Sequence, residues 1–281
     1  MDAPFFSLVV PTVNRTIELV ALFDSLRKQT LRDFELILVD QNEDDRLVSI
    51  VQQYSDLSIT HIYRRKRGAS AARNAGLKIA RGSIITFPDD DCEYKFDFLE
   101  NVREIFDENL NYTGITVFTR DKNFKGSIGR IATKGGPITK FNILPRSAEF
   151  SICVRSAAIE GFYFDEELGV GAPTPWWSDE GPDFILRLIQ KGAYFHYYPN
   201  LVIYHPNPVR IYDEKAFVRS YKYGCGRGKF LRKHSYPIWF VGYIWSLYLV
   251  GVLLGVIQFD QSKIRYYFLG LKGRIQGYLN A

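Results

Sequence analysis

The sequence is poor in cysteine, and the three cysteines that it has lie far apart. Cys92, Cys153 and Cys225 form no C-x-x-C pair, so the sequence predicts neither a disulfide framework nor a zinc site. Scattered thiols of this kind favour a reduced, cytosolic compartment. The N-terminus also lacks a basic segment, and its apolar run stops at Pro11. We therefore interpret this run as a first strand and not as a signal peptide.

An excess of charge of one sign is also lacking. The net charge is +5 over 281 residues, which is too small to indicate a nucleic-acid partner by itself. It is compatible with an anionic ligand or a membrane surface. With 46% hydrophobic and 24% charged residues, the composition is that of a globular protein. The length allows one elaborated domain or two small ones.

Charged residues are absent from Ser235 to Phe259, and basic residues flank this run on both sides. A run of this length reaches the roughly 20 residues that a membrane span needs. However, it contains Pro237 and several glycines, and its tryptophans and tyrosines are typical of a headgroup interface. Three alternatives follow: a buried helical hairpin, helices that lie on or dip into a membrane, and a true span. We favour the second.

Apolar runs alternate with helical patterns through the first hundred residues. Strands are predicted at 6–10, 34–39, 59–63 and 84–87. Helices are predicted at 17–28, 44–54, 70–80 and 96–106. This order predicts an α/β fold, with a mostly parallel, Rossmann-like sheet that is covered by helices on both faces.

The second half is expected to extend this domain. We predict a mobile loop or short hairpin at 119–147, a strand at 149–154, a helix at 182–191 and a strand at 193–198. The predicted division is one domain at 1–210, with a first part at 1–110 and a second part at 111–210. A C-terminal aromatic and basic helical segment would follow at 211–281 and associate with a membrane.

Polar groups follow three of the predicted strands: Thr12 and Asn14 after the first, Asp40 after the second, and Asp89 to Asp91 after the fourth. In parallel sheets, ligands bind beyond the carboxyl ends of the strands. We expect these ends to converge on one crevice.

The three adjacent carboxylates at Asp89, Asp90 and Asp91 repel one another, and burial would raise their pKa values. A divalent cation would relieve this repulsion. Mg²⁺ or Mn²⁺ prefers oxygen ligands and leaves positions open for phosphate oxygens. The alternative is a solvated acidic turn.

A second segment favours the ligand-binding interpretation. Lys66 to Gly76 reads KRGASAARNAG, and its small residues let the start of a helix approach a ligand. A helix N-terminus attracts anions, and Arg73 can neutralise a phosphate there. The alternative is an ordinary helix with an exposed arginine.

Together, VVPTVNR (9–15), LILVDQNEDD (36–45), RGASAARNAG (67–76) and ARGSIITFPDDD (80–91) resemble the nucleotide-sugar-binding half of family 2 glycosyltransferases, which have the GT-A fold. The resemblance covers roughly the first 110 residues, in the same order. It implies nucleotide-sugar binding in 1–110 and acceptor binding in 111–210. It also implies an inverting enzyme that uses a nucleoside-diphosphate sugar and Mn²⁺ or Mg²⁺.

The resemblance also implies roles for single residues at the donor side. Those implied to bind the nucleotide sugar are Pro11, Thr12, Asn14, Arg15, Asp40, Arg73, Asp89 and Asp90. Those implied to bind the metal are Asp91, Asp89 and, less directly, His205, which could equally be an ordinary surface histidine.

The catalytic base is expected in the second half, where GVGAPTPWWSDEGPDFILRL (169–188) resembles the acceptor-site motif of the family. Asp183 and Arg187 keep the spacing of that motif and should pair one helical turn apart. The sequence departs from the motif at Gly181, the usual position of the base. Glu180 is the favoured base and Asp179 the second candidate; alternatively, both cap the following helix.

Trp176 and Trp177 precede this motif, and their flat rings would suit an acceptor sugar or a lipid, although core packing explains them equally well. With Asp183, they complete the predicted acceptor site. The C-terminal segment suggests a lipid-linked saccharide acceptor for surface polysaccharide synthesis, at the cytoplasmic face of the cell membrane, with the protein peripheral or monotopic. The alternatives are a polyprenyl-phosphate glycosyltransferase and a non-catalytic nucleotide-binding membrane scaffold.

Overall fold

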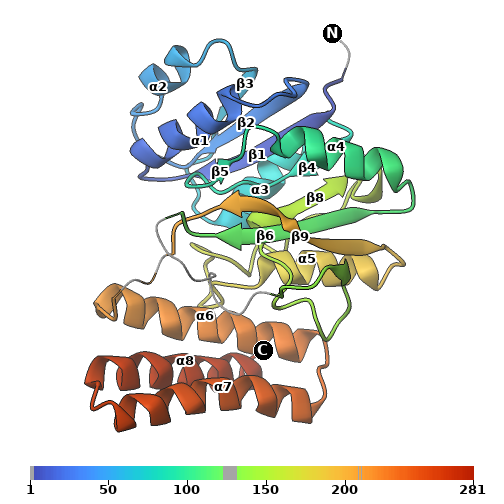
Figure 1. The fold of residues 1–281 in the computed structure, drawn as a ribbon. Helices are drawn as coiled ribbons and strands as arrows, with labels where there is room; N and C mark the ends of the chain where they lie inside the picture. Colours follow the sequence, from blue (N-terminus) through green and yellow to red (C-terminus); the bar gives the residue numbers. More distant parts are fainter. Residues whose placement is uncertain (1–2, 123–131, 208, 210) are drawn as a thin grey trace. The chain divides into compact units, whose positions relative to one another are not determined.

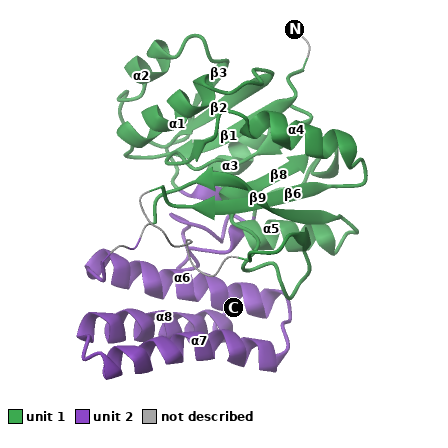
Figure 2. Ribbon diagram, in the orientation of Figure 1, with its two compact units in different colours: residues 1–67, 71–164, 181–207 green, residues 68–70, 165–180, 208–281 purple. Residues whose placement is uncertain are grey.

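A computed structural model gives the fold of the protein and describes residues 3–122, 132–207, 209 and 211–281. The chain forms two compact units (Figure 2). Unit 1 contains residues 1–67, 71–164 and 181–207, and unit 2 contains residues 68–70, 165–180 and 208–281. The segment 165–180 thus groups with the C-terminal helices, and the division into domains at residue 210 stays a prediction.

Unit 1 is an α/β unit, as the sequence predicts (Figure 1). Its strands are β1 (Phe6–Thr12), β2 (Phe34–Asp40), β3 (Ile59–Tyr63), β4 (Ile84–Thr86), β5 (Glu93–Tyr94), β6 (Gly114–Arg120), β7 (Gly136–Pro137), β8 (Ile152–Arg155) and β9 (Phe195–Tyr204). Its helices are α1 (Ile17–Arg27), α2 (Val48–Gln53), α3 (Ala69–Leu77), α4 (Phe98–Glu108) and α5 (Glu180–Ile189), of which α3 and α5 each begin in unit 2. Two short 3₁₀ helices, η1 (Glu149–Ser151) and η2 (Ser156–Ala158), flank β8.

The described strands form one sheet in the order β3-β2-β1-β4-β8-β6-β9-β5, with β7 beside β9. The first four strands in this order are parallel, and the register places Thr12 opposite Asp40 at the carboxyl ends of β1 and β2. From β8 onward the sheet is mixed, because β8 runs antiparallel to both β4 and β6. The mostly parallel arrangement therefore applies to the first half of the sheet.

Alternation along β1 explains why helices cover both faces of the sheet. Phe6, Leu8 and Val10 belong to the core cluster that also contains apolar residues of α1 and α4. Val9 points to the opposite face, where a Cβ added at Gly76 in α3 would contact its side chain. Since successive strand residues face opposite sides, the all-apolar pattern of β1 predicts two covered faces.

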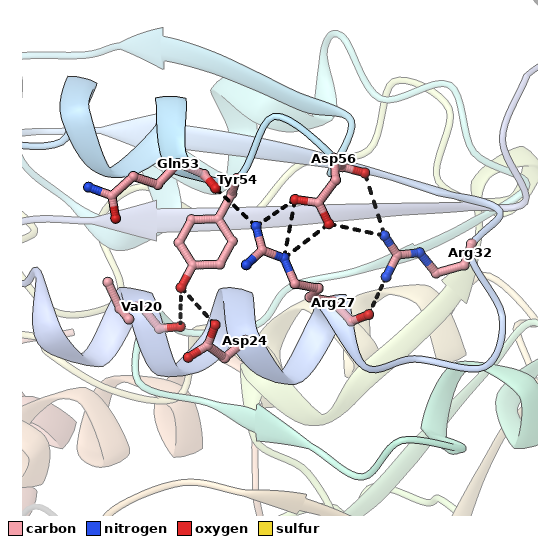
Figure 3. Close-up of polar contacts among 7 residues, drawn as sticks. All are labelled: Val20, Asp24, Arg27, Arg32, Gln53, Tyr54 and Asp56. Atoms are coloured by element: carbon pink, nitrogen blue, oxygen red, sulfur yellow. Dashed lines mark hydrogen bonds and ion pairs between the residues drawn. The ribbon is translucent and has the colours of Figure 1, made fainter.

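The loop between α2 and β3 is fixed to the end of α1 by exposed polar contacts (Figure 3). Arg27 Nε and Nη2 donate to the Asp56 carboxylate, and Nη2 also donates to the Gln53 carbonyl. The Tyr54 hydroxyl donates to Asp24 Oδ1 at 2.8 Å. These contacts lie on the surface, where a salt bridge contributes little to stability.

Several element boundaries differ from the predictions. Helix α2 begins at Val48 and not at Asp44, because the Asp44 carboxylate accepts hydrogen bonds from the backbone and side chain of Arg46. Such local bonds compete with helix formation. Helix α5 begins at Glu180, two residues before the predicted start. Of the predicted loop 119–147, residues 123–131 lie outside the described residues.

In unit 2 the C-terminal helices are α6 (Glu214–Lys233), α7 (Ile238–Ile257) and α8 (Gln261–Leu279). Helix α8 packs on both α6 and α7. Glycines allow the close approach of α6 and α8: a Cβ at Gly224 would lie 3.1 Å from Gly273 Cα. The three described cysteines are all buried and not in disulfides, in agreement with the prediction.

Helix α7 is apolar on its outer face as well as on its inner face. Phe240, Val241 and Ile244 are buried, whereas Trp239 and Ile257 are 64% and 71% exposed. Among the described helices, only α7 is long and apolar enough to cross a membrane, with a mean hydropathy of 2.1. This property follows from the length and composition of α7. A helix of this kind is a candidate for contact with a membrane.

Candidate functional site

The acidic corner, which we define as Asp89, Asp90 and Asp91, lies directly after β4. Asp90 and Asp91 are buried, at 7% and 9% exposure. Asp90 Oδ2 accepts a hydrogen bond of 2.8 Å from the Thr12 hydroxyl, so the ends of β1 and β4 meet here as predicted. The solvated acidic turn is therefore the wrong alternative.

Two arginines and a histidine balance the charge of the acidic corner. Arg15 forms ion pairs with Asp91 and, at 3.3 Å, with Asp90. Arg73 Nη2 donates to Asp89 Oδ1 at 2.6 Å, and its side chain is only 1% exposed. The alternative of an exposed arginine in α3 is therefore wrong. Repulsion among the three carboxylates is thus compensated by cations from the β1–α1 loop and from α3.

The members of the acidic corner differ in their tendency to ionise. Burial raises the pKa of Asp90 to about 7, although Arg15 and Thr12 oppose this shift. Burial also acts against ionisation of Asp91, but His205 and Arg15 outweigh it and lower the pKa of Asp91 to about 2. Of these two carboxylates, Asp91 is the one that is fully ionised and available to a cation at neutral pH.

Asp89, Asp91 and His205 have the geometry of a metal site. One ligand atom from each residue lies within 4.8 Å of the other two, and His205 Nε2 is 3.1 Å from Asp91 Oδ1. The imidazole is fixed by stacking on Phe150, with ring centroids 4.4 Å apart and planes 5° apart. Two carboxylates and one imidazole fit Mn²⁺ or Mg²⁺ better than a soft metal. His205 is buried, so it is not a surface histidine.

The ends of β1 and β2 are joined by a second polar network. Asp40 is fully buried, and its Oδ1 accepts hydrogen bonds from the backbone and side-chain amides of Asn42. His61 Nε2 lies 2.9 Å from Asp40 Oδ2. The backbone N–H of Asn14 donates to Asn42 Oδ1 at 2.7 Å, and Asn14 is in the left-handed region at φ 58°. Sequence reasoning missed both partners of Asp40. Asn42 had one signal, its position two residues after Asp40, whereas His61 is 21 residues away in the sequence.

Pro11 lies beside this network as a buried residue of β1. The residues that the resemblance assigned to nucleotide-sugar binding thus come from the carboxyl ends of β1, β2 and β4, from the β1–α1 loop or from α3, whereas His205 follows β9. The contacts above link most of them. Glu149 was missed at the same place. Burial and the charge of Asp89 raise the pKa of Glu149.

In unit 2, Asp179 is fixed by an arginine of α6. Arg227 Nε and Nη2 each donate to a different carboxylate oxygen of Asp179, both at 2.7 Å. The Ser178 hydroxyl lies 3.0 Å from Asp179 Oδ2. Asp179 has φ 68° and 5% exposure. Both of its oxygens therefore take part in a bidentate ion pair, and sequence reasoning did not find this partner.

Glu180 is the first residue of α5 and is 3% exposed. A Cβ added at Gly169 would lie 2.8 Å from Glu180 Oε1 and 2.9 Å from Ser70 Oγ, so Gly169 leaves room for this carboxylate. Because Glu180 is within the helix, the alternative that it caps a helix starting at Pro182 is wrong.

Gly181, where the sequence departs from the acceptor-site motif, has a structural reason to lack a side chain. A Cβ there would lie 2.6 Å from the backbone nitrogen of Glu149 and 2.7 Å from its Cα. Such contacts require the backbone to shift, so an acidic residue does not fit at this position without rearrangement.

The remaining predicted acceptor residues are Asp183, which follows these acids in the sequence, and Trp176 and Trp177, which precede them. Arg187 Nε donates to Asp183 Oδ2 at 2.8 Å, which confirms the predicted pairing. Lysines of α6 cover the tryptophans: Lys229 Nζ is 4.0 Å from the ring centroid of Trp176, and Lys222 Nζ is 3.3 Å from that of Trp177. Both indole rings are only partly buried and take part in cation–π contacts, so neither is a fully buried core residue.

Comparison with known sequences identifies a family and several relatives. The family described as glycosyl transferase family 2 matches residues 7–167. A GalNAc(5)-diNAcBac-PP-undecaprenol beta-1,3-glucosyltransferase from Campylobacter jejuni is 30% identical over 181 residues, which is 62% of this chain and 59% of that protein. A PGL/p-HBAD biosynthesis glycosyltransferase from Mycobacterium tuberculosis is 35% identical over 113 residues, 39% of this chain and 44% of that protein. These matches span well under two thirds of either relative.

Comparison with solved structures supports the fold. Mannosyltransferase PcManGT from Pyrobaculum calidifontis, solved with GDP-Man and Mn²⁺, has a TM-score of 0.68 at 16% identity; the match covers 99% of this chain and 88% of that one. S. aureus TarS 1-349, solved with UDP-GlcNAc, has a TM-score of 0.60 at 17% identity, with 98% and 92% coverage. At such low identity, these likenesses concern the fold alone.

Proposed function

Because the chain belongs to glycosyl transferase family 2, we propose that it transfers a sugar from a nucleoside-diphosphate sugar to a hydroxyl of a saccharide acceptor, with inversion at the anomeric carbon. One observation carries this proposal: Asp89, Asp91 and His205 converge beside Arg15 and Arg73, at strand ends where α/β sheets bind ligands. This combination of oxygen ligands and guanidinium groups suits a diphosphate and its counter-cation.

On the donor side, we assign the nucleoside to the network at the ends of β1 and β2. Asp40 would accept a hydrogen bond from the base, with Pro11, Thr12 and Asn14 beside it. Asp90 would lie near the ribose, and Arg73 near the diphosphate. Asp91, Asp89 and His205 would hold Mn²⁺ or Mg²⁺, which stabilises negative charge on the departing diphosphate.

On the acceptor side, a carboxylate removes the proton of the attacking hydroxyl. The acceptor oxygen bonds to the sugar C1, the bond from C1 to the diphosphate oxygen breaks, and the nucleoside diphosphate leaves. We assign the base to Glu180, because both oxygens of Asp179 are already used by Arg227. Trp176, Trp177 and Asp183 would contact the acceptor.

We further propose that the acceptor is lipid-linked and that the protein lies on the cytoplasmic face of the cell membrane as part of surface polysaccharide synthesis. The name of the Campylobacter relative includes an undecaprenol-linked saccharide, and α7 exposes apolar residues along its outer face. An exposed patch of this kind needs a partner, and lysines and arginines of α6 and α8 suit anionic lipids.

Vesicle flotation tests the membrane part. The chain should float with vesicles of anionic phospholipid. Ile257→Glu, which places a charge on the exposed face of α7, should abolish flotation. Leu110→Glu is the matched control, because Leu110 is a similarly exposed apolar residue of unit 1. Equal flotation of both variants would contradict docking through α7.

A transfer assay tests the reaction. Purified chain, a panel of UDP and GDP sugars and an undecaprenyl-diphosphate-linked saccharide should give a product whose new linkage has the opposite anomeric configuration to the donor. Activity should disappear with EDTA and return with Mn²⁺ or Mg²⁺. Retention of configuration would contradict the inverting mechanism.

One observation favours a second function. Gly181 replaces the usual base and has no room for a side chain, and a polyprenyl phosphate is already ionised and needs no base. Transfer to polyprenyl phosphate but not to a saccharide hydroxyl would identify this alternative. A chain that binds nucleotide but transfers no sugar to either acceptor would be a nucleotide-binding membrane scaffold.

A further inference from the structure

The arginine that neutralises Asp91 is the most exposed cation of the acidic corner. The Arg15 side chain is 39% exposed, whereas the Arg73 side chain is 1% exposed. Arg15 follows Asn14, which is in the left-handed region, and lies two residues before Ile17, the first residue of α1. It therefore lies on a loop and is not anchored by a helix, so its guanidinium can move at low cost compared with that of Arg73.

Arg15 uses the same carboxylate that the metal would need. Its Nη1 pairs with Asp91 Oδ2, while the other oxygen of Asp91 faces His205. A divalent ion bound to Asp91 and the guanidinium of Arg15 would repel each other at such short range. Coordination of the metal by Asp91 therefore requires that the guanidinium move away. The two cations thus compete for one buried carboxylate.

We propose that Arg15 is an exchangeable internal cation, which holds Asp91 in the absence of metal and is released from it toward the donor diphosphate when the metal binds. This inference rests on the proposed function, since it takes Asp91 as a metal ligand. Arg15 then has two opposite effects. It weakens binding of the metal alone, and it strengthens binding of the nucleotide together with the metal.

The physical reason for the exchange is a balance of charge. Without ligands, the three carboxylates need cations, and Arg15 supplies one at the surface. With the metal present, the corner has a surplus of positive charge, and Arg15 finds a new anionic partner in the diphosphate. Guanidinium groups suit that partner, because they bind phosphate oxygens through several parallel N–H donors.

Binding of Mn²⁺, measured by the loss of the EPR signal of the free ion at constant pH, tests the first effect. Arg15→Gln should bind Mn²⁺ about tenfold more tightly than the unchanged chain, equivalent to about 1.4 kcal/mol. Arg15→Lys keeps the charge and should bind Mn²⁺ less tightly than Arg15→Gln. Arg27→Gln is the matched control, because Arg27 is 40% exposed and pairs with Asp56 away from the corner; its Mn²⁺ affinity should be unchanged.

Calorimetric titration of UDP and GDP in saturating Mn²⁺ tests the second effect. Arg15→Gln should bind the preferred nucleotide about tenfold more weakly, so that one substitution changes the two affinities in opposite directions. Thermal melting of each variant verifies that it is folded. A purely structural role of Arg15 would weaken both affinities together.

The outcomes separate this inference from the proposed function. If the unchanged chain and Arg15→Gln bind Mn²⁺ equally well, or Arg15→Gln binds it more weakly, the exchange is wrong and the metal site stands. If no variant binds Mn²⁺ with or without nucleotide, the metal site of the proposed function is wrong and the exchange is wrong with it. Binding that appears only in Arg15→Gln would support the exchange strongly.

Discussion

Asp91 and Asp179 both lie beside an arginine, but the two arginines hold them differently. Arg15 Nη1 pairs with Asp91 and, at 3.3 Å, with Asp90, from a loop, with its side chain 39% exposed. Arg227 reaches Asp179 with two nitrogens, from α6, with its side chain 23% exposed. The first cation is exposed and shared between two carboxylates, and the second donates two parallel bonds to one carboxylate from a helix.

This difference indicates different uses of the same pair of residue types. An exposed arginine that is shared between two carboxylates can be exchanged for another cation, which suits a carboxylate that accepts a ligand. A bidentate pair fixes the carboxylate and its backbone, which suits a segment that must keep its shape. Asp179 is in the left-handed region, so its ion pair also stabilises an uncommon backbone conformation.

The largest effect should come from the exchangeable pair. Asp91→Asn removes the carboxylate that we propose as a metal ligand. If the metal stabilises the leaving group as proposed, which is worth several kcal/mol, we expect kcat to fall roughly 10³-fold, about 4 kcal/mol. Stability at neutral pH should also fall, because His205 and Arg15 lower the pKa of Asp91, so the ionised carboxylate stabilises the folded state. Transfer assays and thermal melting measure the two quantities. Full activity in this variant would leave Asp91 without a role in the chemistry.

The pair of Asp179 and Arg227, which we call the fixed pair, should give the next largest effect, a loss of stability. Arg227→Met leaves the Asp179 carboxylate buried without its cation, and we expect a loss of about 3 kcal/mol, the lower end for breaking a buried ion pair because Arg227 is partly exposed. Urea unfolding measures this. The double variant Asp179→Asn/Arg227→Met removes both charges and should recover most of the loss. If the single variant were as stable as the unchanged chain, the two pairs would not differ as we describe.

A third change alters the support of the fixed pair without touching a charge. Gly226 precedes Arg227, and a Cβ there would lie 2.6 Å from the backbone nitrogen and the hydroxyl of Ser178. Gly226→Ala should cost about 2 kcal/mol, a typical value for overpacking, and should displace the segment that carries Asp179. Gly242→Ala is the control, because a Cβ at Gly242 meets nothing within 4 Å. Equal unfolding midpoints of the two variants would contradict close packing of α6 on Ser178.

A site could be predicted from the sequence where its residues lie close together along the chain or follow a regular pattern. The acidic corner consists of adjacent residues after an apolar strand, and the rule for parallel sheets places Thr12 and Asp40 at the same edge. The pairing of Asp183 with Arg187 was predictable because helical neighbours four residues apart face each other. Local pattern therefore indicated both.

Partners that tertiary folding brings together were not predictable. Arg227 is 48 residues from Asp179, and the basic segment around it offered several equivalent cations. His61 and Phe150 each lie far in the sequence from their partners, Asp40 and His205. The start of α5 was also missed, since Gly181 and Pro182 suggest a helix boundary, whereas the observed helix includes both.

Glu35 provides the smallest test, as an ordinary structural ion pair for comparison with the other two. Its carboxylate is buried in β2 and accepts hydrogen bonds from the Ser7 hydroxyl and from the backbone and side chain of Arg81. Burial alone would raise the pKa of Glu35, but these hydrogen bonds outweigh it and lower the pKa below its usual value. The folded state therefore binds this proton more weakly than the unfolded state. Glu35 stabilises the fold above the unfolded pKa of about 4.5, and this contribution disappears as the pH falls through the lowered folded value.

We expect Glu35→Gln to cost about 1 kcal/mol at pH 7, the usual worth of a hydrogen-bonded polar group, and to lose most of that difference below pH 4. Urea unfolding of both proteins across this range measures the effect. A Glu35→Gln deficit that stayed constant with pH would mean that packing, and not the charge, carries the contribution. Because Glu35 belongs neither to the acidic corner nor to the Asp179 pair, Mn²⁺ affinity should be unchanged in this variant, which separates stabilising ion pairs from the exchangeable one at Asp91.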